Sequence, residues 1–360
     1  MSPAGNARHI RNDSTGWYLV RFLPVVFICS CGLLVAAASS EAATYYVAAT
    51  DGSDGHSCTQ AQSIITPKAT IQAGVNCIEA SGDMIIVRDG IYTGVGTMCT
   101  ATPIVCVTAG GLPGNPVTVM AENPCVFPSG AAPICGAILD GQNLRSAGFV
   151  VWGTVSYVRI EGFEIRGVVN DAINLNNFGS DFEVVGNYIH DTGRVCSNSA
   201  FGKAGVYTSR PGTSITQNVM HSIGRFANGE NGCPFTIVNL DHGIYANGAS
   251  SLFVANNTFY DFTRGWAIQL YSNPMRGVRI VNNTFALPHP SREGHVLVGA
   301  SLTDCDISGN VSYNPVTAFL RSFGRVQHSG CTVRNNVIYG AELWTSVPAG
   351  VTNAGNEIVR

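Results

Sequence analysis

The residues of this sequence that are best suited to chemistry lie in four short segments that align with one another. Each segment sets an Ile or Val among polar residues, as half-buried β-strands do, and they span residues 169–174, 202–207, 240–245 and 264–269. Aligned on Ile173, Val206, Ile244 and Ile268, they form three polar columns: Asn170, Lys203, Asp241 and Gly265; Asp171, Ala204, His242 and Trp266; and Asn174, Tyr207, Tyr245 and Gln269. The alignment predicts that Lys203 lies one strand from Asp241 and His242.

This group of side chains is suited to eliminative cleavage of an acidic polysaccharide. The reaction removes the proton next to a uronate carboxylate, so it needs a base and a cation that neutralises the carboxylate. Lys203 could act as the base if partial burial lowers its pKa. His242 or Tyr245 could donate a proton, and Asp241 completes the cluster around the lysine.

The charge-neutralising group could be an arginine or a metal ion. Arg264 and Arg210 are the candidate arginines, and Asp171 and Asp241 are possible ligands of a Ca²⁺ ion. We expect the same groove to bind substrate through side chains that flank the columns, namely Asp171, Tyr207, Arg210, Trp266, Gln269 and Tyr271.

Long insertions flank the two segments that contain Lys203 and Asp241. In a repetitive fold, insertions often form the walls of a ligand-binding groove. Cys196 lies seven residues before Lys203 and Cys233 eight before Asp241, so a disulfide between them would join the two insertions beside the cluster.

Three alternatives to a lyase site stay open at this point: a purely structural role for the cluster, a binding or structural protein, and a hydrolase. Lys203 and Asp241 could form only a cross-strand ion pair, which contributes under about 1 kcal/mol at a surface. A glycan-binding or surface-structural protein would need only exposed aromatic residues such as Tyr245, Trp266 and Tyr271. A glycoside hydrolase would need two suitably spaced carboxylates, and of the motifs of polygalacturonases only 170–171 and 241–243 come near.

The element that must position these residues is a stacked coil. Strand-like segments that end in an asparagine recur along the chain, with the equivalent residues Asn187, Asn218, Asn257, Asn283, Asn310 and Asn336. The successive spacings are 31, 39, 26, 27 and 26 residues, and such a period without helical patterning is typical of a β-solenoid. We expect each Asn to adopt a left-handed turn and to bond the equivalent amide one coil away.

We therefore predict an all-β fold, a single-stranded right-handed parallel β-helix with an N-terminal capping helix. Residues 44–47 and 84–88 should be strands, and apolar residues at helical spacing predict a helix over 69–80. Cys305 and Cys331 each lie five residues before a ladder Asn, so they should stack on neighbouring coils within reach of a disulfide.

The N-terminal order of elements resembles that of known secreted β-helix proteins. Tyr-Tyr-Val-Ala at 45–48, a Gly- and Asp-rich loop, the predicted helix and Gly-Asp-Met-Ile-Ile-Val-Arg-Asp-Gly-Ile-Tyr at 82–92 are similar to the cap of pectate-lyase-like proteins, nearest to polysaccharide lyase family nine and its uncharacterised relatives. The resemblance implies the fold, a lysine base and aspartate-bound Ca²⁺. This chain shows no dense aspartate cluster of the kind that those lyases use for calcium.

Composition and the N-terminus indicate an exported protein. Residues 1–42 are expected to be a signal peptide, with an uncleaved membrane anchor as the alternative, followed by the β-helix domain over 43–360 (cap about 43–92, coils about 100–340, then a C-terminal tail). Ten cysteines outside the signal favour disulfides. A charged fraction of 12% and a net charge of −3 argue against nucleic-acid or anionic-membrane partners, so we expect a secreted monomer that binds a polysaccharide.

Overall fold

The computed structural model describes residues 41–360 apart from residue 177 and the ranges 237–239, 262–264 and 289–292. The described residues belong to one compact unit, Ser40–Arg360. The expected signal peptide, residues 1–42, lies almost wholly outside them. Among the described residues, no helix is long and apolar enough to cross a membrane.

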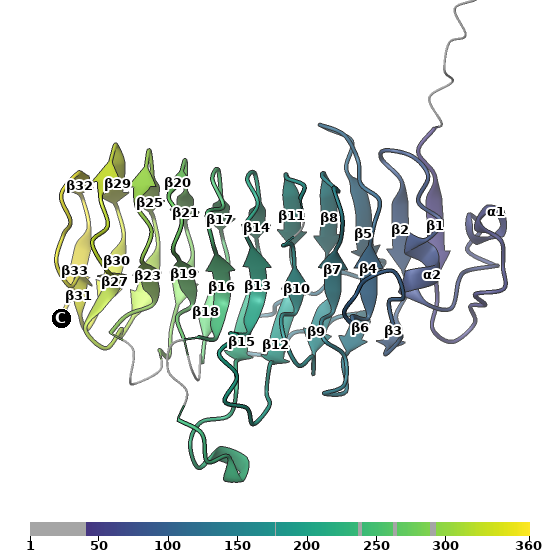
Figure 1. The fold of residues 1–360 in the computed structure, drawn as a ribbon, viewed down its shortest axis with the longest axis horizontal. Helices are drawn as coiled ribbons and strands as arrows, with labels where there is room; N and C mark the ends of the chain where they lie inside the picture. Colours follow the sequence, from purple (N-terminus) through teal and green to yellow (C-terminus); the bar gives the residue numbers. More distant parts are fainter. Residues whose placement is uncertain (1–40, 177, 237–239, 262–264, 289–292) are drawn as a thin grey trace, which may run out of the picture. The chain divides into compact units, whose positions relative to one another are not determined.

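Parallel strands build three long sheets and one short sheet within the described part of the chain (Figure 1). The first sheet contains β1 (Thr44–Val47), β2 (Met84–Val87), β5 (Val117–Ala121), β8 (Val158–Glu161), β11 (Phe182–Val185), β14 (Ser214–Thr216), β17 (Phe253–Ala255), β21 (Arg279–Val281), β25 (Asp306–Ser308), β29 (Cys331–Arg334) and β32 (Val351–Ala354). The second contains β3 (Gly90–Tyr92), β6 (Ala137–Asp140), β9 (Glu164–Arg166), β12 (Tyr188–Thr192), β15 (Val219–Ile223), β18 (Thr258–Tyr260), β22 (Thr284–Phe285), β26 (Val311–Tyr313), β30 (Val337–Tyr339) and β33 (Glu357–Val359). The third contains β4 (Val105–Val107), β7 (Phe149–Val151), β10 (Ile173–Asn174), β13 (Ala204–Thr208), β16 (His242–Ala246), β19 (Ile268–Leu270), β23 (Val296–Val298), β27 (Ala318–Ser322) and β31 (Glu342–Trp344). The short sheet contains β20 (Met275–Arg276), β24 (Leu302–Thr303) and β28 (His328–Ser329).

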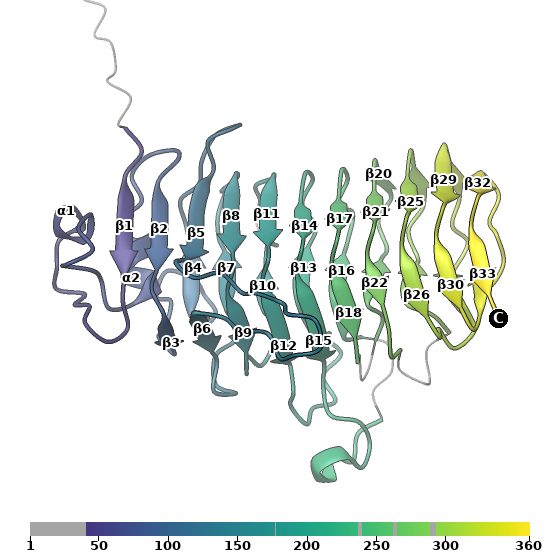
Figure 2. The same ribbon diagram turned by 180° about the vertical axis from the view of Figure 1, so that it is seen from behind.

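Each turn of the chain contributes one strand to the first sheet, one to the second and one to the third. Strands of successive turns therefore lie side by side in the same order in all three sheets, as Figures 1 and 2 show from opposite sides. This is the predicted right-handed parallel β-helix, and the sequence-based expectation of the fold is confirmed.

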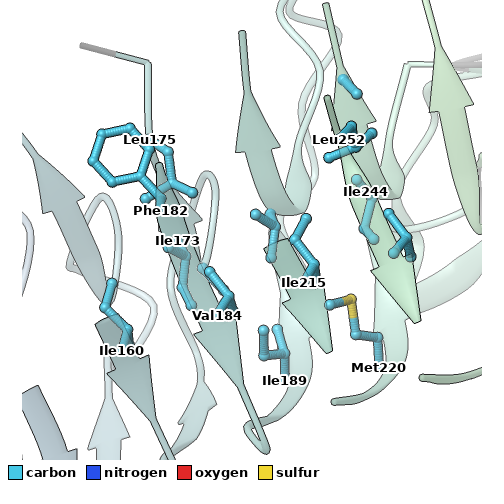
Figure 3. Packing of buried hydrophobic residues seen from close by; sticks show 14 of the residues in the cluster. Ile160, Ile173, Leu175, Phe182, Val184, Ile189, Ile215, Met220, Ile244 and Leu252 are labelled. Carbon is cyan, nitrogen blue, oxygen red and sulfur yellow. The ribbon is translucent and has the colours of Figure 1, made fainter. Parts of the chain in front are cut away.

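The interior of the coil is filled by stacked apolar side chains from all three sheets. Figure 3 shows Ile160, Val184 and Ile215 of the first sheet together with Ile189 and Met220 of the second and Ile173 and Ile244 of the third, and each of these is buried. Like residues repeat at the same place on neighbouring strands, so each coil covers the apolar surface of the next. This stacking is the reason that a coil cannot be stable alone.

The asparagine ladder forms, but the turn and the hydrogen bonds belong to neighbouring residues. The Asn257 side chain donates from Nδ2 to Asn283 Oδ1 at 3.0 Å, and its backbone N–H donates to the same oxygen at 2.9 Å. The left-handed residue is the one before each ladder Asn, for example Asn256 at φ 57° and Asn282 at φ 56°. The expectation that a single Asn does both was wrong, since the ladder Asn must point its amide into the interior.

The capping helix is shorter than predicted. α2 spans Ile71–Val75, following a further short helix, α1 (Cys58–Ala61). Beyond Val75 the chain makes tighter turns, with Cys77 N–H donating to Gly74 O, and Asp83 accepts the next free backbone N–H groups, those of Glu79 and Ala80. The helical spacing of apolar residues continues to Ile78, but the backbone is already out of the helix.

α2 nevertheless closes the open edge of the third sheet. The Gln72 amide accepts the Cys106 N–H at 2.7 Å and donates to Cys106 O at 3.1 Å, which satisfies the backbone of β4 where no earlier strand pairs with it. The Cys58–Cys77 disulfide ties the two helices together.

The coils begin earlier and end later than the predicted range 100–340. β2 and β3 already pair with strands of the next coil, and β31, β32 and β33 continue the coils to Val359 instead of forming a tail. Asn356 adds a further rung, with Asn336 Nδ2 donating to its Oδ1 at 2.8 Å. This rung lies only 20 residues after Asn336, so it escaped a search for the longer spacing.

Candidate functional site

A cleft of about 820 Å³ lies on the outer face of the third sheet. Its floor is built from side chains of β7, β10, β13, β16, β19 and β23. Ser199, Phe201 and Leu240, from the two long insertions, wall it on one side. The insertions thus lie beside the groove as the sequence predicted.

The polar columns predicted from the sequence are the strand register of the structure. Ile173 pairs with Val206, Val206 with Ile244, and Ile244 with Ile268, and Ala204 pairs with His242. Neighbouring strands lie about 4.8 Å apart, so residues of one column follow the coil axis at that interval. The cleft therefore brings together residues that lie as far apart in the chain as Ala101 and Phe323.

Lys203 lies just before β13 and lines the cleft while remaining 8% exposed. Its Nζ donates to Asn170 Oδ1, a neutral amide oxygen, and its backbone N–H donates to Asp241 Oδ1 at 3.0 Å. Burial lowers the pKa of the Lys203 ammonium; the charges of Asp171 and Asp241 oppose this shift and that of Arg225 adds to it. A larger fraction of Lys203 is therefore neutral near pH 8 than of an exposed lysine.

Asp241 does not line the cleft, although it was expected among the catalytic residues. Its side chain is fully buried and paired with Arg225, whose Nη2 lies 2.8 Å from Asp241 Oδ1 and whose Nε lies 3.0 Å from Oδ2. Its carboxylate faces the insertion instead of the groove because Arg225, through its side chain and backbone N–H, and the Lys203 backbone N–H donate to it there. Asp241 thus holds Lys203 in place through the backbone.

Arg225 is a structural residue that sequence reasoning missed. It is fully buried, and besides Asp241 it bonds the cleft wall, with Nη1 donating to Ser199 O at 2.6 Å. It lies in an insertion without strand periodicity, so no pattern pointed to it. The one available signal was a Gly-Arg pair after each of two successive second-sheet strands, at 193–194 and 224–225.

Asp171 faces the cleft at the coil before Lys203. Its Oδ1 accepts the Ala204 N–H at 2.9 Å and its Oδ2 accepts Asn174 Nδ2 at 2.8 Å. Burial raises the pKa of the Asp171 carboxyl to about 6, while its hydrogen bonds and the nearby Lys203 charge oppose the shift. Such a carboxyl exchanges its proton near neutral pH.

His242 lines the cleft one coil beyond Lys203. Its Nδ1 accepts the Trp266 backbone N–H at 3.2 Å, so in the neutral ring the proton is on Nε2. A neutral imidazole fixed in this way is a proton donor at Nε2. Trp266 itself is 5% exposed and does not line the cleft, so the structure does not place it as the aromatic contact that was expected.

Tyr207 and Tyr245 lie in the third column, with stacked rings whose centroids are 5.3 Å apart. Burial raises the pKa of both phenols, and the Asp171 charge raises that of Tyr207 further. Both tyrosines are therefore protonated at neutral pH and can act as hydrogen-bond donors.

Of the two candidate arginines, Arg210 is described by the structure and is not brought into the cleft. Arg210 does not line it; its guanidinium lies over the Phe178 ring at 5.7 Å and donates to Asn176. Arg264 lies outside the described residues, so its role as the charge-neutralising group stays a prediction.

Gln269 and Tyr271 line the far half of the cleft, as expected of substrate-binding residues. Gln269 continues the column of Tyr207 and Tyr245 on β19, and Tyr271 follows that strand. Neither residue lies beside Lys203, which is two coils away.

A disulfide and an ion pair link the two insertions that form the wall of the cleft. Cys196 and Cys233 form a disulfide with a Cα–Cα distance of 5.4 Å, and Arg194 pairs with Glu230 next to the 3₁₀ turn η1 (Glu230–Gly232). Cys305 and Cys331 are also bonded, on neighbouring coils of the first sheet. Five disulfides in all are formed by the described cysteines.

The side chains do not fit a bound Ca²⁺ ion. Asp241 is neutralised by Arg225, and both oxygens of Asp171 already accept hydrogen bonds. Among the described residues, no group of three or more His, Cys, Asp or Glu side chains could hold a metal ion. Calcium needs six to eight oxygen ligands, which is more than the described side chains of the cleft can supply.

Comparison with known proteins places this architecture among solved β-helix structures. An alginate lyase from Paenibacillus sp. str. FPU-7 shares 16% identity at a TM-score of 0.52, over 81% of this chain and 95% of the lyase. XylC, solved with xylose, shares 12% identity at a TM-score of 0.50, over 84% of this chain and 70% of its own. Pectate lyase Pel9A shares 15% identity at a TM-score of 0.47, over 89% of this chain and 78% of the lyase.

The chain has a parallel β-helix fold, which it shares with the alginate lyase and XylC structures. Identities this low establish the shared fold alone, and they confirm at that level the resemblance stated from the sequence. No protein-family model matches the chain, and no curated protein matches it in sequence.

Proposed function

We propose that the protein is a secreted polysaccharide lyase that cleaves a uronate-containing polysaccharide by β-elimination. The observation that carries the proposal is the environment of Lys203. Its Nζ lies in the cleft, nearly buried, and contacts the neutral Asn170 amide instead of a carboxylate. A lysine held in an ion pair would keep its proton, so the contact of Lys203 with a neutral amide supports the proposed role of base.

In the proposed reaction, neutral Lys203 removes the proton next to the uronate carboxylate. The electron pair forms a carbon–carbon double bond as the bond to the glycosidic oxygen breaks. His242 Nε2–H protonates that oxygen, and the proton that Lys203 has gained then returns to the His242 imidazolate through solvent, so both groups recover their starting state. Tyr207 and Tyr245, kept protonated by their raised pKa, donate hydrogen bonds to the carboxylate as negative charge develops on it.

The inventory of the cleft favours a lyase over a hydrolase. Hydrolysis uses a pair of carboxyl groups across the scissile bond. Among the described residues that line the cleft, Asp171 is the one carboxylate. A glycan-binding protein without catalysis is the remaining alternative. An assay of product formation distinguishes it from a lyase. The five disulfides support export to an oxidising compartment.

The proposal is tested by incubating the protein with a panel of uronate polysaccharides and following the ultraviolet absorbance of the unsaturated product, with and without Ca²⁺. Lys203→Ala should lower kcat by about 10² to 10⁴, the usual contribution of a general base. The thermal midpoint of the Lys203→Ala variant should stay near that of the wild type, which shows that the variant is folded. Lyase activity that survives Lys203→Ala would refute the mechanism, and glycan binding without any product would favour the binding protein.

A second readout does not depend on turnover. The chain has only two lysines, Lys68 and Lys203, so NMR of isotope-labelled lysine side chains should give two signals, and Lys203→Arg identifies which is which. The pKa of the Lys203 signal should lie below the ordinary value of 10.5. A pKa at or above that value contradicts the role of base.

A further inference from the structure

The cleft has two halves that differ in charge. Asp171, Lys203 and His242 lie on the coils of β10, β13 and β16. The coils of β19, β23 and β27 contribute Gln269, Tyr271, Leu297 and Phe323, and every described residue that lines this half is uncharged. Gln269 lies two coils from Lys203, which is about 10 Å along the axis.

Among the described residues, the cation that follows the second half in the same column is already paired. Arg321 follows Leu297 in the same column, one coil further along. It does not line the cleft, and its Nε contacts the Glu293 carboxylate. No described side chain therefore offers an unpaired positive charge to a carboxylate bound opposite Gln269.

The Gln269 side chain is among the residues that line this half. The residue is 6% exposed, and its Oε1 is buried without a hydrogen-bond partner among the described residues. A buried acceptor that lacks a donor is destabilising unless a ligand supplies one. The two kinds of sugar differ at C6: the hydroxyl of a neutral hexose can donate to this oxygen, whereas the carboxylate of a uronate in the same place only accepts.

Aromatic rings border this amide. Tyr271 and Phe323 have ring centroids 6.1 Å apart, and Phe323 is half exposed. The Tyr271 ring lies against the backbone of the next coil, where a Cβ on Gly299 would come within 2.6 Å of its Cδ2. The absence of a side chain at Gly299 is therefore what allows the ring to lie there, and the apolar faces of sugar rings pack well on such rings.

We propose that Gln269, Tyr271, Leu297 and Phe323 form a subsite for a neutral sugar. The substrate is then a heteropolysaccharide in which a neutral sugar lies near the uronate that Lys203 attacks, not a polymer of uronate alone. The inference rests on the proposed function for the assignment of Lys203. The subsite itself can be tested without turnover.

The experiment uses the exported chain carrying Lys203→Ala and two hexasaccharides of equal length. One is a homo-oligomer of galacturonate, and the other alternates glucuronate with glucose. Calorimetry should show that the alternating oligomer binds at least about tenfold more tightly, the factor expected from one buried hydrogen bond. Gln269→Leu should remove this preference and leave binding of the homo-oligomer unchanged.

Two further variants sharpen the test. Gly299→Ala should displace the Tyr271 ring and weaken the alternating oligomer selectively, without altering Gln269. Gln269→Arg should instead strengthen binding of the homo-oligomer, because it adds a cation opposite the second uronate.

Equal or tighter binding of the homo-oligomer by the Lys203→Ala chain would overturn the proposal, as would an equal loss for both ligands in Gln269→Leu. The proposed function fails independently. Suppose that the protein binds the alternating oligomer through Gln269 but the wild type forms no unsaturated product. The neutral-sugar subsite would then be supported, and the lyase function would be refuted.

Discussion

The coils around Lys203 and the coils that follow them share the three long sheets but differ in their turns, and the later coils add the short sheet of β20, β24 and β28. Between Asn187 and Asn257 the ladder spacings are 31 and 39 residues, whereas from Asn257 to Asn336 they are 26, 27 and 26. The longer coils contain the buried Arg225–Asp241 pair and the cleft wall. In the regular coils a comparable pair, Arg334 with Asp306, lies at the surface.

The comparison indicates where function has been added to the scaffold. The ladder and the apolar stack are the same in both regions, so they account for stability and not for specificity. The added residues of the longer coils bring buried charge, which is destabilising unless it is fully paired. Such an arrangement persists most readily where a site requires it.

The largest expected effect comes from breaking the buried pair. Arg225→Met should lower the free energy of unfolding by about 3 to 5 kcal/mol, because Asp241 is left as an uncompensated buried charge. Arg334→Met, the matched change in the regular coils, should lower it by less than about 1 kcal/mol. Urea unfolding of both variants measures the difference, and equal losses would contradict the distinction between the regions.

Removing one disulfide from each region comes next. Cys196→Ser with Cys233→Ser and Cys305→Ser with Cys331→Ser open loops of 37 and 26 residues, so each should lower stability by a similar amount, about 2 to 4 kcal/mol. Only the first should raise KM, since only that bond fastens the cleft wall. A rise in KM in both variants would show that the wall has no separate role.

Substitutions in the ladder should be alike in the two regions. Asn218→Ala and Asn283→Ala each leave a backbone N–H and a backbone carbonyl without their side-chain partner, so each should lower stability by about 1 to 3 kcal/mol. Thermal unfolding measures both. If the two losses of stability differ by more than about 2 kcal/mol, the width of the expected range, then the ladder is not uniform along the chain.

The smallest effect concerns pH and belongs to the cleft alone. The folded chain holds a proton on Asp171 up to about pH 6, whereas an unfolded chain releases it near the ordinary pKa of 3.8. Relative to the Asp171→Asn variant, the wild type should therefore lose about 1 to 2 kcal/mol of stability as the pH rises from 4 to 6, after allowance for partial exposure of Asp171. Asp171→Asn should lose this dependence. A wild type and a variant with parallel pH profiles would exclude the raised pKa.

Much of the architecture could be predicted because strands have a fixed period. The columns that bring Lys203, His242 and Tyr245 together follow from aligning Ile and Val residues, and the register is set by those apolar positions. The orientation of Asp241 could not be predicted, since it depends on the buried pairing with Arg225. Arg225 was missed because its insertion has no periodic pattern.

The asparagine ladder separates the length of a coil from its spacing. Its Asn-to-Asn hydrogen bonds stay between 2.8 and 3.0 Å whether the chain between rungs has 20 residues or 39. Extra residues leave the coil sideways at a turn and do not shift the strands on either side. A wall can therefore be lengthened, shortened or replaced within a single coil while every neighbouring floor residue keeps its place, so that the wall is an interchangeable part on a scaffold of constant pitch.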